Sequence, residues 1–178
     1  MRRLAFPLAA ALLVVAGLAA CAAPATPEAM APRGAIVAAA RPLPYTVSVV
    51  TRGGSETSTV GSTNVSDADL KAAVESAIRE SRAFREVVPD GGDDRLTVTV
   101  VQLSKPSIGF DFTVTMETAW TLVRASDQQV VLRKVVSGTH TASTKDSFVG
   151  AKRLQVAVEG AARRNIEQGL AEIAGLGL

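Results

Sequence analysis

The chain has 178 residues, of which 19 are Lys or Arg and 17 are Asp or Glu, and it contains a single cysteine, Cys21. One cysteine excludes an internal disulfide, so the folded part must be stabilised by its apolar core. Without residues 1–20, the chain keeps 17 basic and 17 acidic side chains, a balance that argues against nucleic acid as a partner.

Residues 1–20 have the pattern of a secretory signal peptide. Two arginines follow the initiating methionine, and an uncharged, alanine-rich run extends from Leu4 to Ala20. A basic start, an apolar stretch and small residues at its end are typical of a cleaved signal. The run holds 17 residues and includes Pro7, which is short and interrupted for a helix that must cross about 30 Å of hydrocarbon.

The last three residues of the signal and the lone cysteine form a motif. Leu18, Ala19, Ala20 and Cys21 resemble the lipobox of bacterial lipoproteins. The resemblance implies that the signal is cut before Cys21, that its thiol carries a diacylglycerol, and that its new amine is acylated, for example with palmitate. Because Ala22, and not an aspartate, follows the cysteine, it also implies the periplasmic face of the cell outer membrane. A chance cysteine at the end of a signal peptide is the alternative.

Residues 21–44 are predicted to form a tether between the membrane and the domain. This segment is rich in alanine and contains five prolines: Pro24, Pro27, Pro32, Pro42 and Pro44. Such a composition favours extended, polyproline-like backbone that spans about 3.1 Å per residue.

Residues 45–178 have the length of one domain. Alternation predicts a strand over 45–51. Ser66, followed three residues later by an acid, predicts the start of a helix that ends near Phe84. Residues 84–88 are a candidate for a short edge strand before a turn at 89–92.

Three further strands and a second helix follow. A strand is predicted over 96–103, with a change of phase near Val101 that indicates a β-bulge. Two antiparallel strands come next, the second over 130–139, and then a long helix over 148–176 with a small-residue patch at Gly160. Close packing of that helix on the sheet is favoured for the patch; a gap for a ligand is the alternative. The first of these two strands alternates apolar and polar residues, interrupted only by Thr118, with this apolar side: Phe110, Phe112, Val114, Met116, Trp120 and Leu122.

The order β-α-β-β-β-α predicts an α+β fold, a two-layer sandwich with a mostly antiparallel four-stranded sheet and two helices on one face. With the lipobox and the Val101-Gln102-Leu103 strand end, this order resembles the YajG-type small lipoproteins over about residues 95–175, and more distantly the LptE and PqiC types. The Gly-Phe-x-Leu-Arg sequence that usually follows the lipid cysteine in LptE proteins is absent, since Ala22-Ala23-Pro24 stands at that place. The YajG-type resemblance implies no chemistry.

Catalytic and metal-binding patterns are missing from the sequence. The only histidine, His140, has no Gly-x-Ser-x-Gly elbow to partner it, and we expect an exposed loop histidine. Because the chain has one histidine and its only cysteine is expected to carry lipid, the sequence lacks the ligand spacing of a metal site. Asp90, Asp93 and Asp94 are expected in a solvated turn because the rest of a calcium loop is absent. The loop Arg52–Ser55 lacks the lysine of a phosphate-binding loop. We expect no cofactor and no enzymatic activity.

The remaining candidate is the polar side of the alternating strand, which is either solvated or a docking face for a partner. The sequence therefore predicts a non-enzymatic lipoprotein that faces the periplasm and binds or scaffolds an envelope protein or glycan. An accessory role in lipid or lipopolysaccharide transport, with an apolar cleft near Gly160, is the alternative. The possible partner face consists of Asp111, Thr113, Thr115, Glu117 and Thr121.

Overall fold

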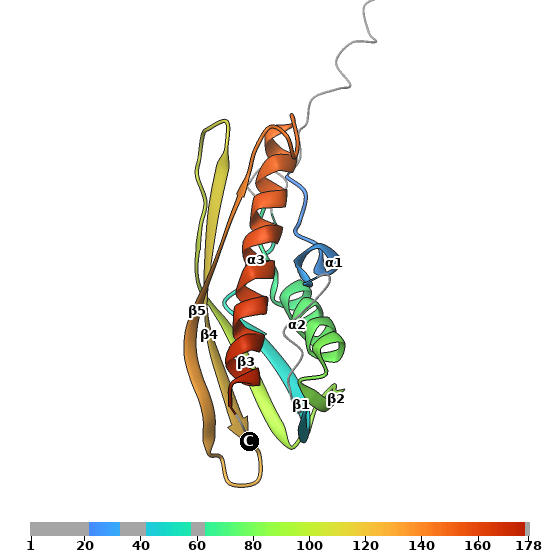
Figure 1. Cartoon of the computed structure of the whole chain (residues 1–178). Helices are drawn as coiled ribbons and strands as arrows, with labels where there is room; N and C mark the ends of the chain where they lie inside the picture. The colour runs from blue at the N-terminus through green and yellow to red at the C-terminus, as the bar shows by residue number, and fades with distance from the viewer. Residues whose placement is uncertain (1–21, 33–41, 58–62, 177–178) are drawn as a thin grey trace, which may run out of the picture.

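The computed structural model describes residues 22–32, 42–57 and 63–176. Its centre is one five-stranded sheet with the strand order β2-β1-β3-β4-β5. Three helices lie on the same side of this sheet, and its other face carries no helix of the described part (Figure 1). The strands are β1 (Leu43–Arg52), β2 (Phe84–Val88), β3 (Asp94–Ser104), β4 (Phe112–Arg124) and β5 (Val130–Ala142).

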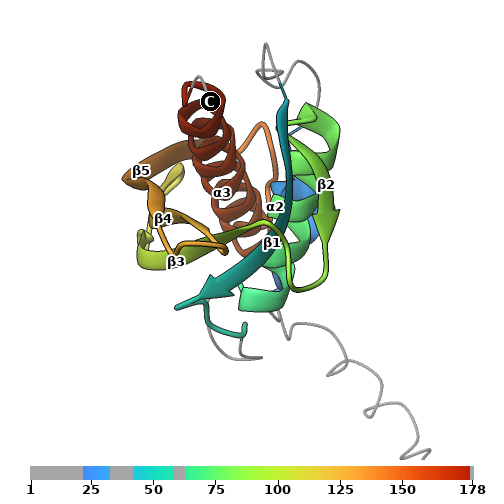
Figure 2. The same ribbon diagram turned by 90° about the horizontal axis from the view of Figure 1, so that it is seen from below.

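The helices divide the sheet between them. The second helix, α2 (Asp67–Ser81), covers β1 and β2, whereas α3 (Gly150–Ala174) covers β4 and β5 (Figure 2). A single-turn helix, α1 (Pro27–Met30), fills the space between α2 and α3. The predicted α+β class with helices on one face is confirmed.

The predicted start of α2 is confirmed by its cap. Ser66 Oγ accepts a hydrogen bond from Asp69 N at 3.1 Å, which satisfies an amide that the helix itself leaves free. The helix ends three residues earlier than expected, at Ser81, because Arg82 adopts a left-handed conformation with φ of 54°. This turn directs the chain into β2.

The prediction of a four-stranded, mostly antiparallel sheet is wrong in two respects. Residues 84–88 add a fifth strand, and β1 pairs in parallel with both β2 and β3. The β3–β4 and β4–β5 pairs are antiparallel. The helix α2 supplies the long connection that the parallel β1–β2 pair requires.

Between β2 and β3 the chain crosses over β1. Val88 and Asp94 pair with the neighbouring residues Ser48 and Val47 of β1, from opposite sides. The crossing passes so close to β1 that a Cβ at Gly92 would lie 2.9 Å from Ser48 N. Only a residue without a side chain fits there, so Gly92 permits the crossing.

The alternation of β4 is confirmed for most of its length. Val114, Met116, Trp120 and Leu122 are fully buried. Phe110 is a correction: β4 begins at Phe112, and the Phe110 side chain is 84% exposed. The bulge predicted near Val101 is confirmed, since the β3–β4 register shifts between Val100 and Gln102.

Thr118, which interrupts the apolar set, is buried in a hydrogen-bonded network with α3. Its hydroxyl donates to Asn165 Oδ1 at 2.6 Å and accepts from Trp120 Nε1 at 2.8 Å. The Asn165 amide nitrogen donates to the carbonyls of Met116 and Val136, both at 3.0 Å. A buried hydroxyl, amide and indole are thus satisfied together, which fixes the height of α3 over the sheet.

The expected tether over 21–44 differs from the structure for residues 22–32, which lie on the domain. The Met30 side chain is fully buried, Thr26 N donates to Glu159 Oε1 at 3.2 Å, and Gln155 Nε2 donates to Pro24 O at 2.8 Å. An alanine- and proline-rich segment can dock because its backbone groups find partners on α3 and in residues 63–64. Residues 33–41 lie outside the described part.

Candidate binding cleft

The sequence predicted that His140 lies in an exposed loop, and this prediction is wrong. The residue lies within β5, and its ring rests against α3 so closely that a Cβ at Gly160 would be 2.2 Å from it. Burial lowers the pKa of His140, and the charge of Arg163 acts in the same direction. In the described part of the chain no hydrogen bond joins His140 to a serine, so the geometry of a base and nucleophile is not formed.

The position of the His140 ring also shows whether the small-residue patch at Gly160 packs closely on the sheet or leaves a gap for a ligand. The ring occupies the space above Gly160 in which the sequence left room for a ligand. Close packing of helix and sheet is therefore confirmed at this position.

The three aspartates of the predicted acidic turn, Asp90, Asp93 and Asp94, lie in three different environments. Asp93 Oδ2 accepts from Thr46 N at 2.8 Å and Thr46 Oγ1 at 2.9 Å, and these bonds lower the pKa of Asp93. Asp94 is buried in β3, where desolvation raises the pKa of its carboxyl. Asp90 accepts from Gly91 N at 2.8 Å within the turn. Among the residues described, no group of three His, Cys, Asp or Glu side chains could hold a metal ion.

The glycine-containing loop after β1 already holds a carboxylate from its own chain. Gly54 N donates to Asp67 Oδ1 at 2.8 Å, at the start of α2. A Cβ at Gly54 would lie 2.7 Å from Asp67 N, so this glycine serves the close packing of the loop on the helix.

The predicted partner face is brought together on the open face of the sheet. Thr113 pairs with Thr141 and Thr115 with Thr139 across β4 and β5, with hydroxyl oxygens 2.8 and 2.9 Å apart. Glu117 and Thr121 follow on the same face of β4, while Asp111 lies in the loop before it. The threonine pairs satisfy each other, as cross-strand pairs do.

The lipobox residues Leu18, Ala19, Ala20 and Cys21, and the signal peptide, lie outside the described residues. Ala22, the first described residue, directly follows Cys21 in the chain. Within the described ranges, no helix has the length and apolar character needed to cross a bilayer.

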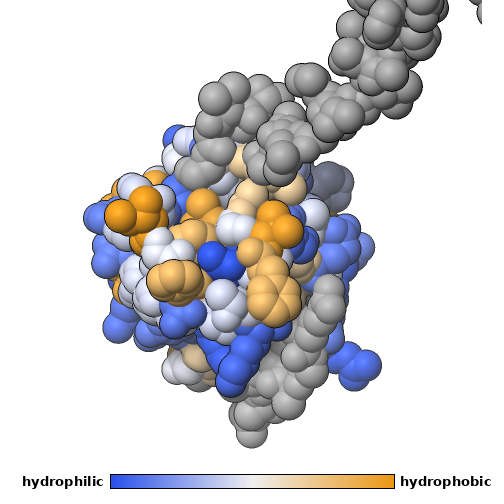
Figure 3. Space-filling model, turned by 90° about the horizontal axis from the view of Figure 1, so that it is seen from above, coloured by the Kyte–Doolittle hydropathy of each residue, from blue (hydrophilic) through white to orange (hydrophobic). Residues whose placement is uncertain are grey.

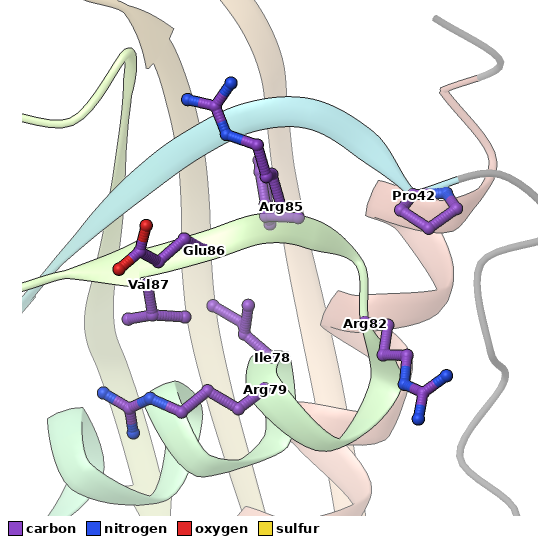
Figure 4. A pocket seen from close by; sticks show the side chains of 8 residues that line it. Pro42, Ile78, Arg79, Arg82, Arg85, Glu86 and Val87 are labelled. Carbon is purple, nitrogen blue, oxygen red and sulfur yellow. The ribbon is translucent and has the colours of Figure 1, made fainter.

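An open cleft of about 570 Å³ lies between the end of α2 and the edge strand β2. Its floor is apolar: Ile78 is 1% exposed and Phe84 4% exposed, and Val87 is half-buried beside them. Figure 4 shows Ile78 and Val87 pointing toward each other, with the guanidinium groups around them. The residues that line it are Pro42, Ile78, Arg79, Arg82, Phe84, Arg85, Glu86 and Val87.

Three arginines and one glutamate give the rim of the cleft a positive charge. Arg79 pairs with Glu75 at 3.0 Å and Arg85 with Asp93 at 3.4 Å, whereas Arg82 has no ionic partner among the described residues. Exposed pairs of this kind contribute about 0–1 kcal/mol each, so a ligand carboxylate could replace either partner at small cost. The guanidinium groups point in different directions (Figure 4), which suits an elongated anion better than a small one.

The sequence contains a pattern at this cleft, a regular spacing of arginines, that does not by itself predict a binding site. Arg79, Arg82 and Arg85 are three residues apart, but the helix ends at Ser81 and β2 begins at Phe84. A single helical face therefore could not be assumed. The outer edge of β2 completes the site, since no strand of the described part pairs with it.

In comparisons of the sequence, no family model and no curated protein matches this chain. Solved structures are similar in fold. Protein XCC0632 from Xanthomonas campestris, of the family DUF330, is 17% identical, with 82% of this chain and 91% of that chain covered and a TM-score of 0.59. The hypothetical protein CT253 from Chlamydia trachomatis is 7% identical, with 74% and 96% covered and a TM-score of 0.55.

A predicted lipoprotein from Caulobacter crescentus is also similar, at 13% identity and a TM-score of 0.48, over 72% of this chain and 87% of that one. The specific resemblance to the YajG, LptE and PqiC types is not tested by these comparisons and stays a prediction. What the two higher TM-scores establish is that this chain shares the fold of XCC0632 and CT253 over most of its length.

Proposed function

We propose that the protein is a non-enzymatic lipoprotein, anchored through Cys21 at the periplasmic face of the outer membrane, that binds an acidic, extended segment of an envelope protein. The observation that carries the binding role is the arginine-rimmed cleft beside the free edge of β2. The anchor rests on the lipobox at residues 18–21.

The cleft offers two kinds of contact to such a segment. The backbone of β2 can accept an added strand, which supplies affinity through main-chain hydrogen bonds. Carboxylates on the segment would then meet the guanidinium of Arg82, which has no ionic partner in the described residues, and those of Arg79 and Arg85. Alternate apolar side chains would contact Ile78 and Val87 on the floor.

The lipid-transport alternative has lost the feature that it required. It placed an apolar cleft near Gly160, and the ring of His140 occupies that position. The open threonine face remains a second predicted docking surface, and we do not assign it a partner.

Photo-crosslinking in the envelope tests the binding role. A photoreactive amino acid at Val87, on the floor of the cleft, should form a covalent adduct with one envelope protein. The charge reversal Arg82→Glu should reduce the yield of that adduct several-fold, because it places a carboxylate against those of the segment. High salt should have the same effect.

Arg133→Glu is the matched control, since Arg133 is exposed on β5 and does not line the cleft. It should leave the adduct unchanged. Equal loss with both reversals, or an adduct whose yield is insensitive to Arg82→Glu, would show that the cleft is not the binding site.

A further inference from the structure

Four large apolar side chains are exposed at one end of the molecule. Phe148 is 91% exposed, Ile108 88%, Phe110 84% and Val149 59%. They belong to two loops, one before Phe112 and one after Ala142, and these two residues pair with each other across β4 and β5. Figure 3 shows this end, where orange side chains gather among hydrophilic ones. We call Ile108, Phe110, Phe148 and Val149 the apolar end.

The apolar end is held in shape by Arg153 on the first turn of α3. Its guanidinium lies 4.9 Å from the centre of the Phe112 ring, and its Nη1 donates to Ser147 O at 2.7 Å and to Phe148 O at 3.4 Å. The loop that carries Phe148 is closed further by Ser143 N, which donates to Asp146 Oδ2 at 2.7 Å. These contacts fix the loop backbone while its apolar side chains stay in contact with solvent.

The start of the folded chain lies at this same end. Pro24 and Thr26 are hydrogen-bonded to Gln155 and Glu159, in the first turns of α3. Cys21 is three residues before Pro24, so its Cα lies within about 11 Å of the Pro24 Cα, given 3.8 Å per residue. Lipid chains on Cys21 would therefore start close to the apolar end, with no long tether between them.

We propose that the apolar end is a membrane-contact surface, which inserts Phe110 and Phe148 with their aliphatic neighbours into the interface of the bilayer that anchors Cys21. The proposal rests on the lipidation of Cys21. Aromatic and aliphatic side chains beside a lipid anchor are the groups that settle between headgroups and acyl chains. The charged residues close to it in sequence include Asp111, Lys145, Asp146 and Lys152, two acidic and two basic, so apolar contact and not lipid charge carries the attachment.

This orientation directs the arginine-rimmed cleft away from the membrane. Phe112 begins β4 at the apolar end, and Arg124 ends it at the other. Arg124 lies over the ring of Tyr45, at 5.8 Å, and Tyr45 is two residues after Leu43, which pairs with Phe84 of the cleft. The protein would thus stand on its apolar end and present the cleft to the periplasm.

Quenching by lipid tests the proposal. The lipidated protein is reconstituted into phosphatidylethanolamine–phosphatidylglycerol vesicles with or without brominated acyl chains. The indoles introduced by Phe148→Trp and, separately, Phe110→Trp should be quenched by the brominated lipid. The control is Val135→Trp, on an exposed residue of β5 about 23 Å from Ala142 at 3.3 Å per residue. Its indole should be quenched several-fold less, and the buried native Trp120 gives the same background in every variant.

Mass spectrometry of the N-terminal peptide from each preparation reads the anchor separately. Acylated protein whose indoles at the apolar end are quenched no more than in Val135→Trp overturns the membrane contact and leaves the lipoprotein assignment intact. Shielding of these indoles from aqueous iodide without quenching by lipid overturns it too, and indicates a protein partner. Absence of acyl chains on Cys21 overturns both.

Discussion

Gly138 on β5 lies directly under Asn165 on α3: a Cβ at Gly138 would be 2.3 Å from Asn165 N and 2.3 Å from Ala161 O. Both are backbone atoms of a helix and cannot turn aside as a side chain can. Gly138→Ala should therefore lift α3 from the sheet and destabilise the protein by about 1–3 kcal/mol, measured by denaturant unfolding.

Gly150→Ala is the matched control for that measurement. A Cβ there would meet only Arg153 Nη2, at 3.9 Å, and it lies at the start of a helix. It should leave stability unchanged or raise it by up to about 1 kcal/mol. If the two variants unfold alike, α3 and β5 are not packed as closely as described.

The buried network of Asn165 predicts a second loss. Asn165→Ala removes the partner of the Thr118 hydroxyl and of the Met116 and Val136 carbonyls. Leaving such groups unsatisfied should cost about 1–3 kcal/mol. Thr115→Val breaks an exposed hydroxyl pair that water replaces, and should change stability by less than about 0.5 kcal/mol. A larger effect of Thr115→Val than of Asn165→Ala would refute the assignment of the network to the core.

Asp94 predicts a pH-dependent effect. Its Oδ1 has no hydrogen-bond partner among the described residues, and burial raises the pKa of its carboxyl above 3.8 despite the opposing charge of Arg124. Because the unfolded chain gives up this proton more readily, ionisation weakens the fold as the pH rises above 3.8. Asp94→Asn should raise Tm at pH 7, with a gain that disappears below pH 3.8. A gain that is the same at both pH values would contradict this cause.

Met30 tests whether residues 22–32 belong to the domain. Its side chain is fully buried, next to α2 and α3. Met30→Ala should destabilise the protein by about 2–5 kcal/mol, as a core truncation does. In a free tether, the same substitution would leave the thermal unfolding curve unchanged.

The elements that local pattern specifies could be predicted from the sequence. The alternation of β4 and the Ser66 cap of α2 predict these two elements, because both signals involve residues near each other in the chain. The sequence does not predict the pairing of β1. Its two parallel neighbours depend on the crossing at Gly92, which a local pattern does not encode.

Contacts over long separations explain the other differences. Thr118 looked like an interruption because its partner, Asn165, is 47 residues away. Residues 22–32 looked like a tether because composition does not show that Met30 and the backbone of Pro24 have partners on the helices. The cleft cannot be predicted from the sequence without the facts that α2 ends at Ser81 and that β2 is an edge strand.

The anchor at Cys21 supports both the location and the orientation proposed here, and intact-mass analysis of the protein extracted from envelopes tests it most directly. We predict a mature chain that begins at Cys21, carries the mass of three acyl chains, and partitions into detergent. Cys21→Ser should lose that mass while the folded domain keeps its Tm. A protein that fractionates as soluble, with a Cys21 thiol that titrates freely, would contradict the account.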